Sequence, residues 1–266
     1  MRLGASGPPG LKIMGQIKSA AEISAIRQAC RLAQQVLEEV GASLRPGMTT
    51  REVDEFAAER IRACGARSAF LGYRNFPCHT CISVNDEVVH GIAGSRRLQF
   101  GDLVSVDVGV LHRGFVGDTA ATFPVGGCDP AGQRLMDVTR EALDAGIREA
   151  RADRCVVDIS RAVQTVVEAA GFSVVREFVG HGVGRSVHEE AQIPNFVESG
   201  RRSPRLRAGM TLAIEPMVNA GRREVRMLND GWTVVTADGK LSAHFEHTVL
   251  VTDGEPEVLT CRERTP

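Results

Sequence analysis

The amino-terminal part of the sequence carries two amphipathic helix patterns, each opened by a capping box. Ser19–Glu22 (SAAE) precedes apolar residues that continue at helical spacing as far as Val40, which predicts a helix that Gly41 ends. Thr49–Glu52 (TTRE) opens a second pattern, and this helix is predicted to stop near Gly65. The first part of the chain is therefore predicted to be helical.

Two further amphipathic helices are predicted near the middle of the chain. They cover Gln133–Arg151 and Asp158–Ala170, each with Leu, Ile, Val and Ala residues along one face. Gly171 follows the second helix, where a glycine commonly closes a helix. Each half of the chain thus has two helices followed by strands. This leaves an internal duplication open, although the sequence shows no convincing repeat.

The hydrophobic pattern changes between Gly101 and Pro124. Two apolar runs, Leu103–Leu111 and Phe115–Phe123, flank the tripeptide His112–Gly114, which predicts a β-hairpin. Further strands are expected at 81–85, 172–179, 210–218, 232–236 and 243–251. The sequence FLGYRNFP at 70–77 is expected to form a loop with exposed aromatic side chains.

These elements predict an α+β fold with a mainly antiparallel sheet. No linker interrupts the pattern, so residues 18–266 are expected to form one domain. The Gly- and Pro-rich residues 1–17 are expected to form a flexible arm and lack the apolar core of a signal peptide.

Composition excludes several classes of function. The net charge of −1 gives no electrostatic basis for nucleic acid as the main partner, and the arginines within 201–207 and 222–226 are interpreted as solvated loops. No apolar run approaches the roughly 18 residues of a membrane span. The seven cysteines form no regular framework, which favours a reduced, cytoplasmic compartment. Cys78 and Cys81 form a single C-x-x-C, which is weak support for zinc or redox chemistry.

Each strand of the predicted hairpin carries one carboxylate among apolar residues, Asp107 and Asp118. A carboxylate in apolar surroundings is costly unless it is paired, neutralised or bound to a metal. Two of them on adjacent strands would also repel each other, and a cation between them removes both problems. The alternative, that each caps a turn or pairs with a nearby arginine, stays open for either residue alone.

Three more residues could complete a metal site. Glycines frame His181 in VGHGVG, whereas Glu215 and Glu246 lie within apolar strand segments. Each has an alternative interpretation as an ordinary loop histidine or a paired carboxylate. Four carboxylates balance two divalent cations, and such a pair supports hydrolysis. Oxygen-rich ligation with one imidazole suits Mn, Fe, Co or Zn.

The ordered set of motifs around these five residues resembles type I methionine aminopeptidases, in their short bacterial form. The eleven-residue step between the two aspartates, the upstream VHGI at 89–92 and the single Trp232 also match that family. The resemblance extends from about Lys18 to Val258. It implies the pita-bread fold, in which two pseudo-symmetric halves form a curved, mainly antiparallel sheet covered by helices.

The resemblance also implies a function, which is cytoplasmic removal of the initiator methionine from nascent polypeptides whose second residue is small. Asp107 and Glu246 would bridge two metal ions, Asp118 would bind one ion, and His181 and Glu215 would bind the other. A bridging hydroxide would attack the scissile carbonyl, with Glu215 accepting a proton. The remaining implied residues contact the substrate: His188 at the carbonyl, His90 at the leaving amide, and Tyr73, Phe76 and Trp232 around the methionine side chain. A monomer is expected, and a transient ribosome contact is left open.

Three positions depart from the family pattern. Val187 stands where the family usually has an aromatic residue, which predicts a wider methionine pocket. Ala93 replaces a usual proline, which predicts a looser loop around His90. His244 replaces a polar amide and is expected to donate to a carboxylate near the metals, rather than to bind a metal itself.

Two other functions are compatible with this fold. A proline-specific dipeptidase on the same fold usually carries a large amino-terminal domain, and only about 18 residues precede the first helix here. A metal-free binding protein should have lost one or more ligands, and all five are present. The sequence therefore favours the metallopeptidase.

Overall fold

The structure is a computed structural model that describes residues 15–198, 200 and 203–261. Most of the predicted arm at 1–17, and the first two arginines of the 201–207 patch, lie outside the described residues. The helices within the described part are α1 (Ala20–Ser43), α2 (Thr50–Ala63), η1 (Tyr73–Asn75, a 3-10 turn), α3 (Pro130–Arg148) and α4 (Val156–Ala169). Among these residues, no helix is both long and apolar enough to cross a bilayer.

Both predicted capping boxes are present. Ser19 Oγ accepts the Glu22 backbone N–H while the Glu22 carboxylate accepts the Ser19 N–H, and Thr49 and Glu52 repeat the arrangement. The prediction that Gly41 ends α1 was wrong, because the helix continues to Ser43. Gly41 has a packing role instead, since a Cβ added there would overlap the Phe123 ring of the adjacent sheet.

The boundaries of the later helices shift by a few residues from those predicted. α3 begins at Pro130, earlier than expected, because Asp129 caps it by accepting the Gly132 N–H at 2.6 Å. α4 begins at Val156 and ends before Gly171. Gly171 adopts φ +79° and donates its N–H to the Glu168 carbonyl, so the predicted helix stop is confirmed.

The predicted hairpin is the centre of the main sheet. β4 (Leu103–His112) and β5 (Phe115–Pro124) pair in unbroken antiparallel register. Arg113 and Gly114 turn the chain with φ of 49° and 81°, as a two-residue hairpin turn requires. The sheet runs β1-β4-β5-β14-β9-β7-β8, with β2 paired to β4 and β15 to β14. Its remaining strands are β1 (Arg67–Ser68), β2 (Cys81–Val84), β7 (Gly180–Gly182), β8 (Glu189–Ile193), β9 (Thr211–Ile214), β14 (Glu246–Leu250) and β15 (Glu257–Val258).

Two of the predicted strands are each broken into two. The stretch 210–218 divides into β9 and β10, and 243–251 divides into β13 and β14. Pro216 cannot donate a ladder hydrogen bond, so β9 cannot continue through it. In both cases one part joins the main sheet and the other joins a smaller sheet. Glu215 and Glu246 therefore lie where the two sheets meet.

Two three-stranded antiparallel sheets complete the fold. They have the orders β13-β10-β6 and β11-β12-β3. Their strands are β3 (Glu87–Val89), β6 (Ser173–Val174), β10 (Met217–Asn219), β11 (Val225–Met227), β12 (Val234–Thr236) and β13 (Ser242–His244). The predicted strand at 172–179 is thus reduced to two residues, while those at 81–85 and 232–236 are confirmed in shortened form.

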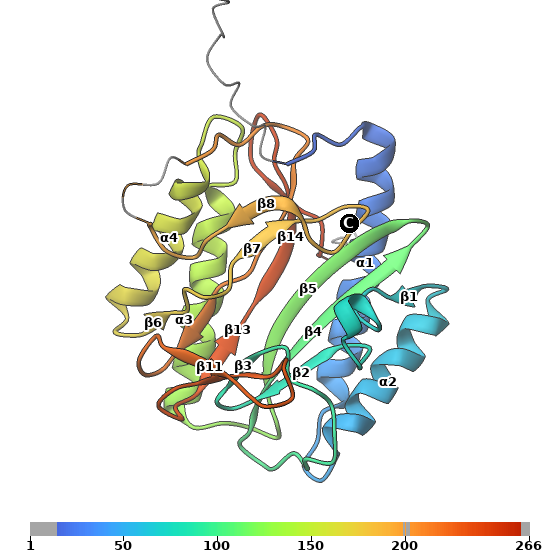
Figure 1. The fold of residues 1–266 in the computed structure, drawn as a ribbon, viewed down its shortest axis with the longest axis vertical. Helices are drawn as coiled ribbons and strands as arrows, with labels where there is room; N and C mark the ends of the chain where they lie inside the picture. The colour runs from blue at the N-terminus through green and yellow to red at the C-terminus, as the bar shows by residue number, and fades with distance from the viewer. Residues whose placement is uncertain (1–14, 199, 201–202, 262–266) are drawn as a thin grey trace, which may run out of the picture.

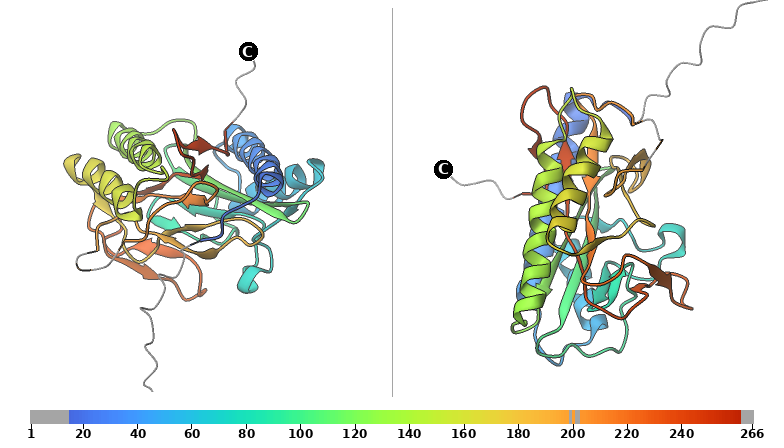
Figure 2. Two further views of the ribbon diagram at one scale, coloured as in Figure 1. Left: turned by 90° about the horizontal axis from the view of Figure 1, so that it is seen from above. Right: turned by 90° about the vertical axis from the view of Figure 1, so that its left-hand side faces the viewer.

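The elements form layers (Figures 1 and 2). The four α-helices cover one face of the main sheet, whereas η1, β3 and β11 lie on the opposite face. One apolar core lies under α1 and α2, and another under α3 and α4. The predicted α+β class with antiparallel sheets is confirmed, and the face of the main sheet that the α-helices leave free is available for a site.

The sequence predicted exposed aromatic side chains in the loop that contains η1. In the structure, the phenylalanines of this loop are buried. Phe70 is 8% exposed and Phe76 is 3% exposed. Both pack in an apolar cluster with Val116 and Val187. The expectation of exposed aromatics was wrong because burial here depends on residues distant in sequence.

Close packing of α1 on the hairpin makes Gly117 a sensitive position. A Cβ added there would overlap the backbone of Ala29 and Cys30 in α1. Gly117→Ala is expected to lower the free energy of unfolding by about 2 kcal/mol, because backbone cannot yield as a flexible side chain can. Urea unfolding of the metal-free protein measures this.

Gly94→Ala is the matched control, since no atom lies within 4 Å of the added Cβ there. It should change the free energy of unfolding by less than about 0.5 kcal/mol. Equal denaturation midpoints for the two variants would contradict this account of the packing.

Candidate metal centre

All ten site residues predicted from the sequence line one cavity, here called the site cavity. Its volume is about 240 Å³. The ten residues are Tyr73, Phe76, His90, Asp107, Asp118, His181, His188, Glu215, Trp232 and Glu246. They come from segments spread over more than half of the chain, so only the tertiary fold brings them together.

The register of the main sheet explains why three carboxylates meet. Asp107 in β4 lies opposite Ala120 in β5, and Ala120 lies opposite Glu246 in β14. Directly opposed residues project from the same face of a sheet. Asp118 shares that face because it precedes Ala120 by two residues. The three acids therefore project together from neighbouring strands.

Glu215 and His181 lie next to these three acids. The five residues Asp107, Asp118, His181, Glu215 and Glu246 are here called the acidic cluster. Glu215 follows the last residue of β9, and β9 pairs with β14 on one side and with β7 on the other. His181 in β7 places its Nε2 3.3 Å from Glu215 Oε1 and 3.9 Å from Asp118 Oδ2. Its Nδ1 lies 3.0 Å from the Gly182 carbonyl oxygen, which leaves Nε2 as the nitrogen directed at the acids.

The cluster has too little positive charge to balance its acids. Oδ1 of Asp107, Oδ1 of Asp118 and Oε1 of Glu246 are buried and have no hydrogen-bond partner among the described residues. One ligand atom from each of Asp118, His181 and Glu246 can be chosen so that all three lie within 4.8 Å of one another. Buried, unsatisfied carboxylate oxygens converging with an imidazole are the donor set that a divalent cation satisfies.

The pKa shifts of these groups, which follow from their burial, agree with the same interpretation. Burial, followed by repulsion among the acids, raises the pKa of Asp107, Asp118, Glu215 and Glu246 well above the usual range. Burial also lowers the pKa of His181 to about 3. The imidazole is therefore neutral near pH 7, as a metal ligand must be.

Two further histidines border the cluster. His188 Nδ1 lies 3.0 Å from the Tyr73 hydroxyl, and the His188 ring centroid is 4.2 Å from that of His181. His90 adopts φ +59°, a left-handed conformation that is uncommon outside glycine and frequent at functional sites. Its ring meets those of Phe178 and Trp232 edge-on. Both imidazoles are thus fixed at the edge of the acidic cluster.

Apart from Arg74, the rest of the site cavity is mainly aromatic and aliphatic. The Phe76 and Trp232 rings meet edge-to-face with centroids 5.0 Å apart, and Tyr73 stacks on His188. Sequence reasoning missed several of the lining residues. These are Phe70, Arg74, Cys81, Val89, Phe178, Val179 and Met217. Phe70 lies in the FLGY stretch that also contains Tyr73, which was the available signal for it.

The three departures from the family pattern can now be placed. Val187 is 4% exposed and lines the site cavity within the same apolar cluster as Phe70. His244 is buried behind Glu215, with its Nε2 3.6 Å from Glu215 Oε2 and without a hydrogen-bond partner among the described residues. Ala93 packs at the margin of the same cluster as Val187.

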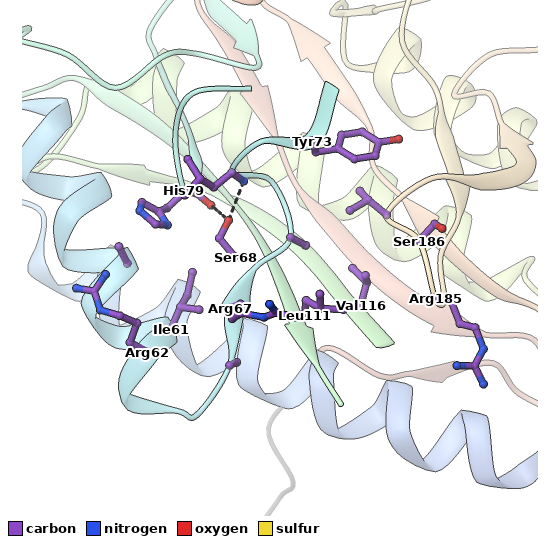
Figure 3. Close-up of a pocket in the computed structure, with 15 residues that line it drawn as sticks. Ile61, Arg62, Arg67, Ser68, Tyr73, His79, Leu111, Val116, Arg185 and Ser186 are labelled. Carbon is purple, nitrogen blue, oxygen red and sulfur yellow. Dashed lines mark hydrogen bonds between the residues drawn. The ribbon is translucent and has the colours of Figure 1, made fainter. Parts of the chain in front are cut away.

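A second hollow, here called the outer hollow, adjoins the site cavity (Figure 3). Its volume is about 620 Å³, and it shares Tyr73 and Val187 with the site cavity. Arg62, Arg67 and Arg185 lie around it, and no residue of the acidic cluster lines it. Tyr73 and Val187 therefore form a wall between the two spaces.

Comparison with known proteins places this site in a family. The model of metallopeptidase family M24 matches residues 24–253. The chain belongs to metallopeptidase family M24. A methionine aminopeptidase of Clostridium perfringens is 50% identical to this M24 chain over 244 residues, which is 92% of this chain and 98% of that protein.

Solved structures agree with the family assignment. A methionine aminopeptidase from Thermotoga maritima matches this M24 chain with a TM-score of 0.90 and 43% identity, covering 94% of this chain and all of that one (100%). A prolidase from Pyrococcus furiosus matches with a TM-score of 0.74 over 93% of this chain and 66% of that one. At 23% identity the prolidase shows the fold alone. The pita-bread fold implied by the sequence is confirmed, and membership of M24 makes the chain a metal-dependent peptidase.

Binding of divalent cations is expected to release protons from the acidic cluster. Because the pKa values of its carboxyls are raised, the metal-free site holds protons that exposed carboxyls would have lost. A cation requires ionised ligands and must displace these protons. Titration calorimetry with Mn²⁺ in two buffers of different ionisation enthalpy should show net proton release, and the affinity should increase with pH.

Asp118→Asn provides the comparison, because asparagine preserves the size of the side chain and cannot titrate. This variant should bind Mn²⁺ more weakly and release fewer protons. An apparent binding enthalpy that is the same in both buffers for the unaltered protein would contradict the prediction.

Proposed function

We propose that this M24 chain removes the N-terminal methionine from nascent polypeptides whose second residue is small. The observation that carries the proposal is the site cavity, in which the acidic cluster opens onto a pocket of aromatic side chains, Met217 and the Cys81 thiol. Methionine is a flexible apolar side chain whose sulfur interacts favourably with aromatic rings. The names of the closely similar aminopeptidases support the same substrate.

The acidic cluster would hold two divalent ions, drawn from Co, Mn, Fe and Zn. Asp107 and Glu246 would bridge them, Asp118 would bind one, and His181 with Glu215 would bind the other. When bound, such ions lower the pKa of water toward neutrality and supply the hydrolytic nucleophile. The charge of four carboxylates balances two divalent ions, and the unsatisfied oxygens of Asp107, Asp118 and Glu246 support this assignment.

The chain's own residues would orient the substrate and move protons. Glu215 would accept a proton from the attacking water, since its carboxylate is in the acidic cluster. Nδ1 of His188 is hydrogen-bonded to the Tyr73 hydroxyl. Nε2 of His188 is therefore the nitrogen that would donate to the scissile carbonyl oxygen. His90 would contact the leaving amide.

The methionine side chain would lie among Tyr73, Phe76 and Trp232, with Phe70 completing the wall. Phe70 packs with Val187, so an aromatic ring already borders the space next to position 187. The proposal extends to a monomeric, cytoplasmic enzyme that acts on chains emerging from the ribosome. Residues 18–266 would form its single catalytic domain, following an arm at 1–17.

The test is hydrolysis of a Met-Ala-Ser peptide by metal-stripped protein to which Mn²⁺, Co²⁺, Fe²⁺ or Zn²⁺ is returned. Free methionine should appear only when metal is present. Asp107→Asn should reduce kcat by at least about a thousandfold while the protein remains folded by circular dichroism, because the substitution removes one ionised ligand.

A dipeptide ending in proline is the control substrate, and it should not be cleaved. Cleavage of that dipeptide in preference to Met-Ala-Ser would favour a proline-specific peptidase. If no metal restores activity on either substrate, the chain is a binding protein on a peptidase fold. Near-normal turnover by Asp107→Asn would refute the bridging role.

Val187→Phe is expected to increase the preference for N-terminal methionine over leucine or norleucine several-fold. The larger ring would narrow the methionine pocket on the side that position 187 shares with Tyr73. The ratio of kcat/KM values for peptides differing only in the first residue measures the change. Leu71→Phe is the matched control, because Leu71 is 49% exposed and lines only the outer hollow. An identical ratio in both variants would exclude position 187 from shaping the pocket.

A further inference from the structure

A buried ion pair joins the start of the described chain to the loop that carries His188. Lys18 Nζ lies 2.6 Å from Glu189 Oε2, and these side chains are 3% and 11% exposed. The two residues are 171 positions apart in sequence. Removing one partner of such a pair leaves an uncompensated buried charge, so the two groups constrain each other strongly.

Lys18 is itself held in place just before α1. Its backbone N–H donates to the Gly209 carbonyl at 2.8 Å, and its ammonium also donates to the Gln16 carbonyl at 3.3 Å. The next residue, Ser19, caps α1. The ammonium is therefore a fixed point rather than the end of a mobile side chain.

The Glu189 carboxylate connects the Lys18 ammonium to the loop at 184–188. Its Oε1 accepts the Arg185 backbone N–H at 3.2 Å. A Cβ at Gly184 would overlap Glu189 Oε1 and crowd the Lys18 side chain, so the loop lies directly on the ion pair. Figure 3 shows Arg185 and Ser186 of this loop on the side of the outer hollow facing Ser68 and Tyr73.

The loop presents two groups to the site cavity. Val187 forms part of its wall, and His188 contacts Tyr73 and the His181 ring. Because the Glu189 carboxylate holds the Arg185 N–H, loss of its position would release the loop whose last residue is His188 and so shift the imidazole. A shift of about 1 Å in such a group is enough to reduce turnover strongly.

We propose that Lys18 is a positioning residue, which holds His188 in its productive orientation through the buried pair with Glu189. The inference rests on the proposed function, because it takes His188 as the donor to the scissile carbonyl. A second, exposed bridge joins Arg185 to Glu22 at 3.3 Å, with side chains 64% and 30% exposed. Exposed pairs contribute little, so the buried pair carries the effect.

The test compares Lys18→Met with Glu22→Gln, using the Mn²⁺-loaded protein and the Met-Ala-Ser peptide. Lys18→Met should lower kcat by about tenfold or more with KM within about twofold, because an interaction used mainly in the transition state is lost. Glu22→Gln removes only the exposed bridge and keeps an acceptor for the capping box, so both constants should stay within about twofold. The Mn²⁺ content of each variant should equal that of the unaltered protein.

The double variant Lys18→Met/Glu189→Leu separates positioning from stability. Replacing both buried charges by apolar groups should restore the free energy of unfolding, so this protein can be assayed even where Lys18→Met does not fold. We expect kcat to stay low, since the link to the loop is still missing. Recovery of kcat together with stability would overturn the proposal, as would an unchanged kcat in Lys18→Met. Absence of methionine release by the unaltered protein would instead refute the proposed function.

Discussion

Four carboxylates that converge at one face of the main sheet, largely shielded from water, are the constraint on which the site depends. Asp107, Asp118 and Glu246 project from three neighbouring strands, and Glu215 adjoins them at the end of a fourth. Their mutual repulsion and lost hydration would oppose folding if all were ionised without a counter-charge. Divalent ions would offset that free-energy cost, so the same ions that supply the reactive chemistry would also stabilise the ionised carboxylates.

The sheet can carry these acids because its two faces have different surroundings. Helices cover one face (Figure 2). On that face the strands pack against the helices through Val, Leu and Ile side chains. The main sheet meets the smaller sheet β13-β10-β6 next to Glu215 and Glu246, where each strand is interrupted. Glu246 still follows the alternation of its strand, opposite Ala120, whereas the break in the ladder after β9 lets the Glu215 side chain turn toward the cavity.

Loops supply several of the groups proposed to contact substrate, and two of these loops are held by buried polar contacts. Asp54 of α2 accepts hydrogen bonds from the Thr80 N–H and hydroxyl, both at 2.8 Å, and so holds the end of the loop that carries Tyr73 and Phe76. The pair of Lys18 and Glu189 does the same for the loop that carries His188. Such anchors place loop residues as firmly as residues on strands, which precise catalytic geometry requires.

The sequence by itself determined the local structures and the chemistry of the acidic residues. Capping boxes, the hairpin at 101–124 and acids inside apolar runs are visible within a few residues, because capping, turn geometry and desolvation act locally. Only the tertiary structure decided that Phe70 and Phe76 are buried, that Gly41 lies within a helix, and that Glu215 and Glu246 lie where sheets meet. Those outcomes depend on packing between residues far apart in the chain, as does the pairing of Lys18 with Glu189, and no local pattern encodes such contacts.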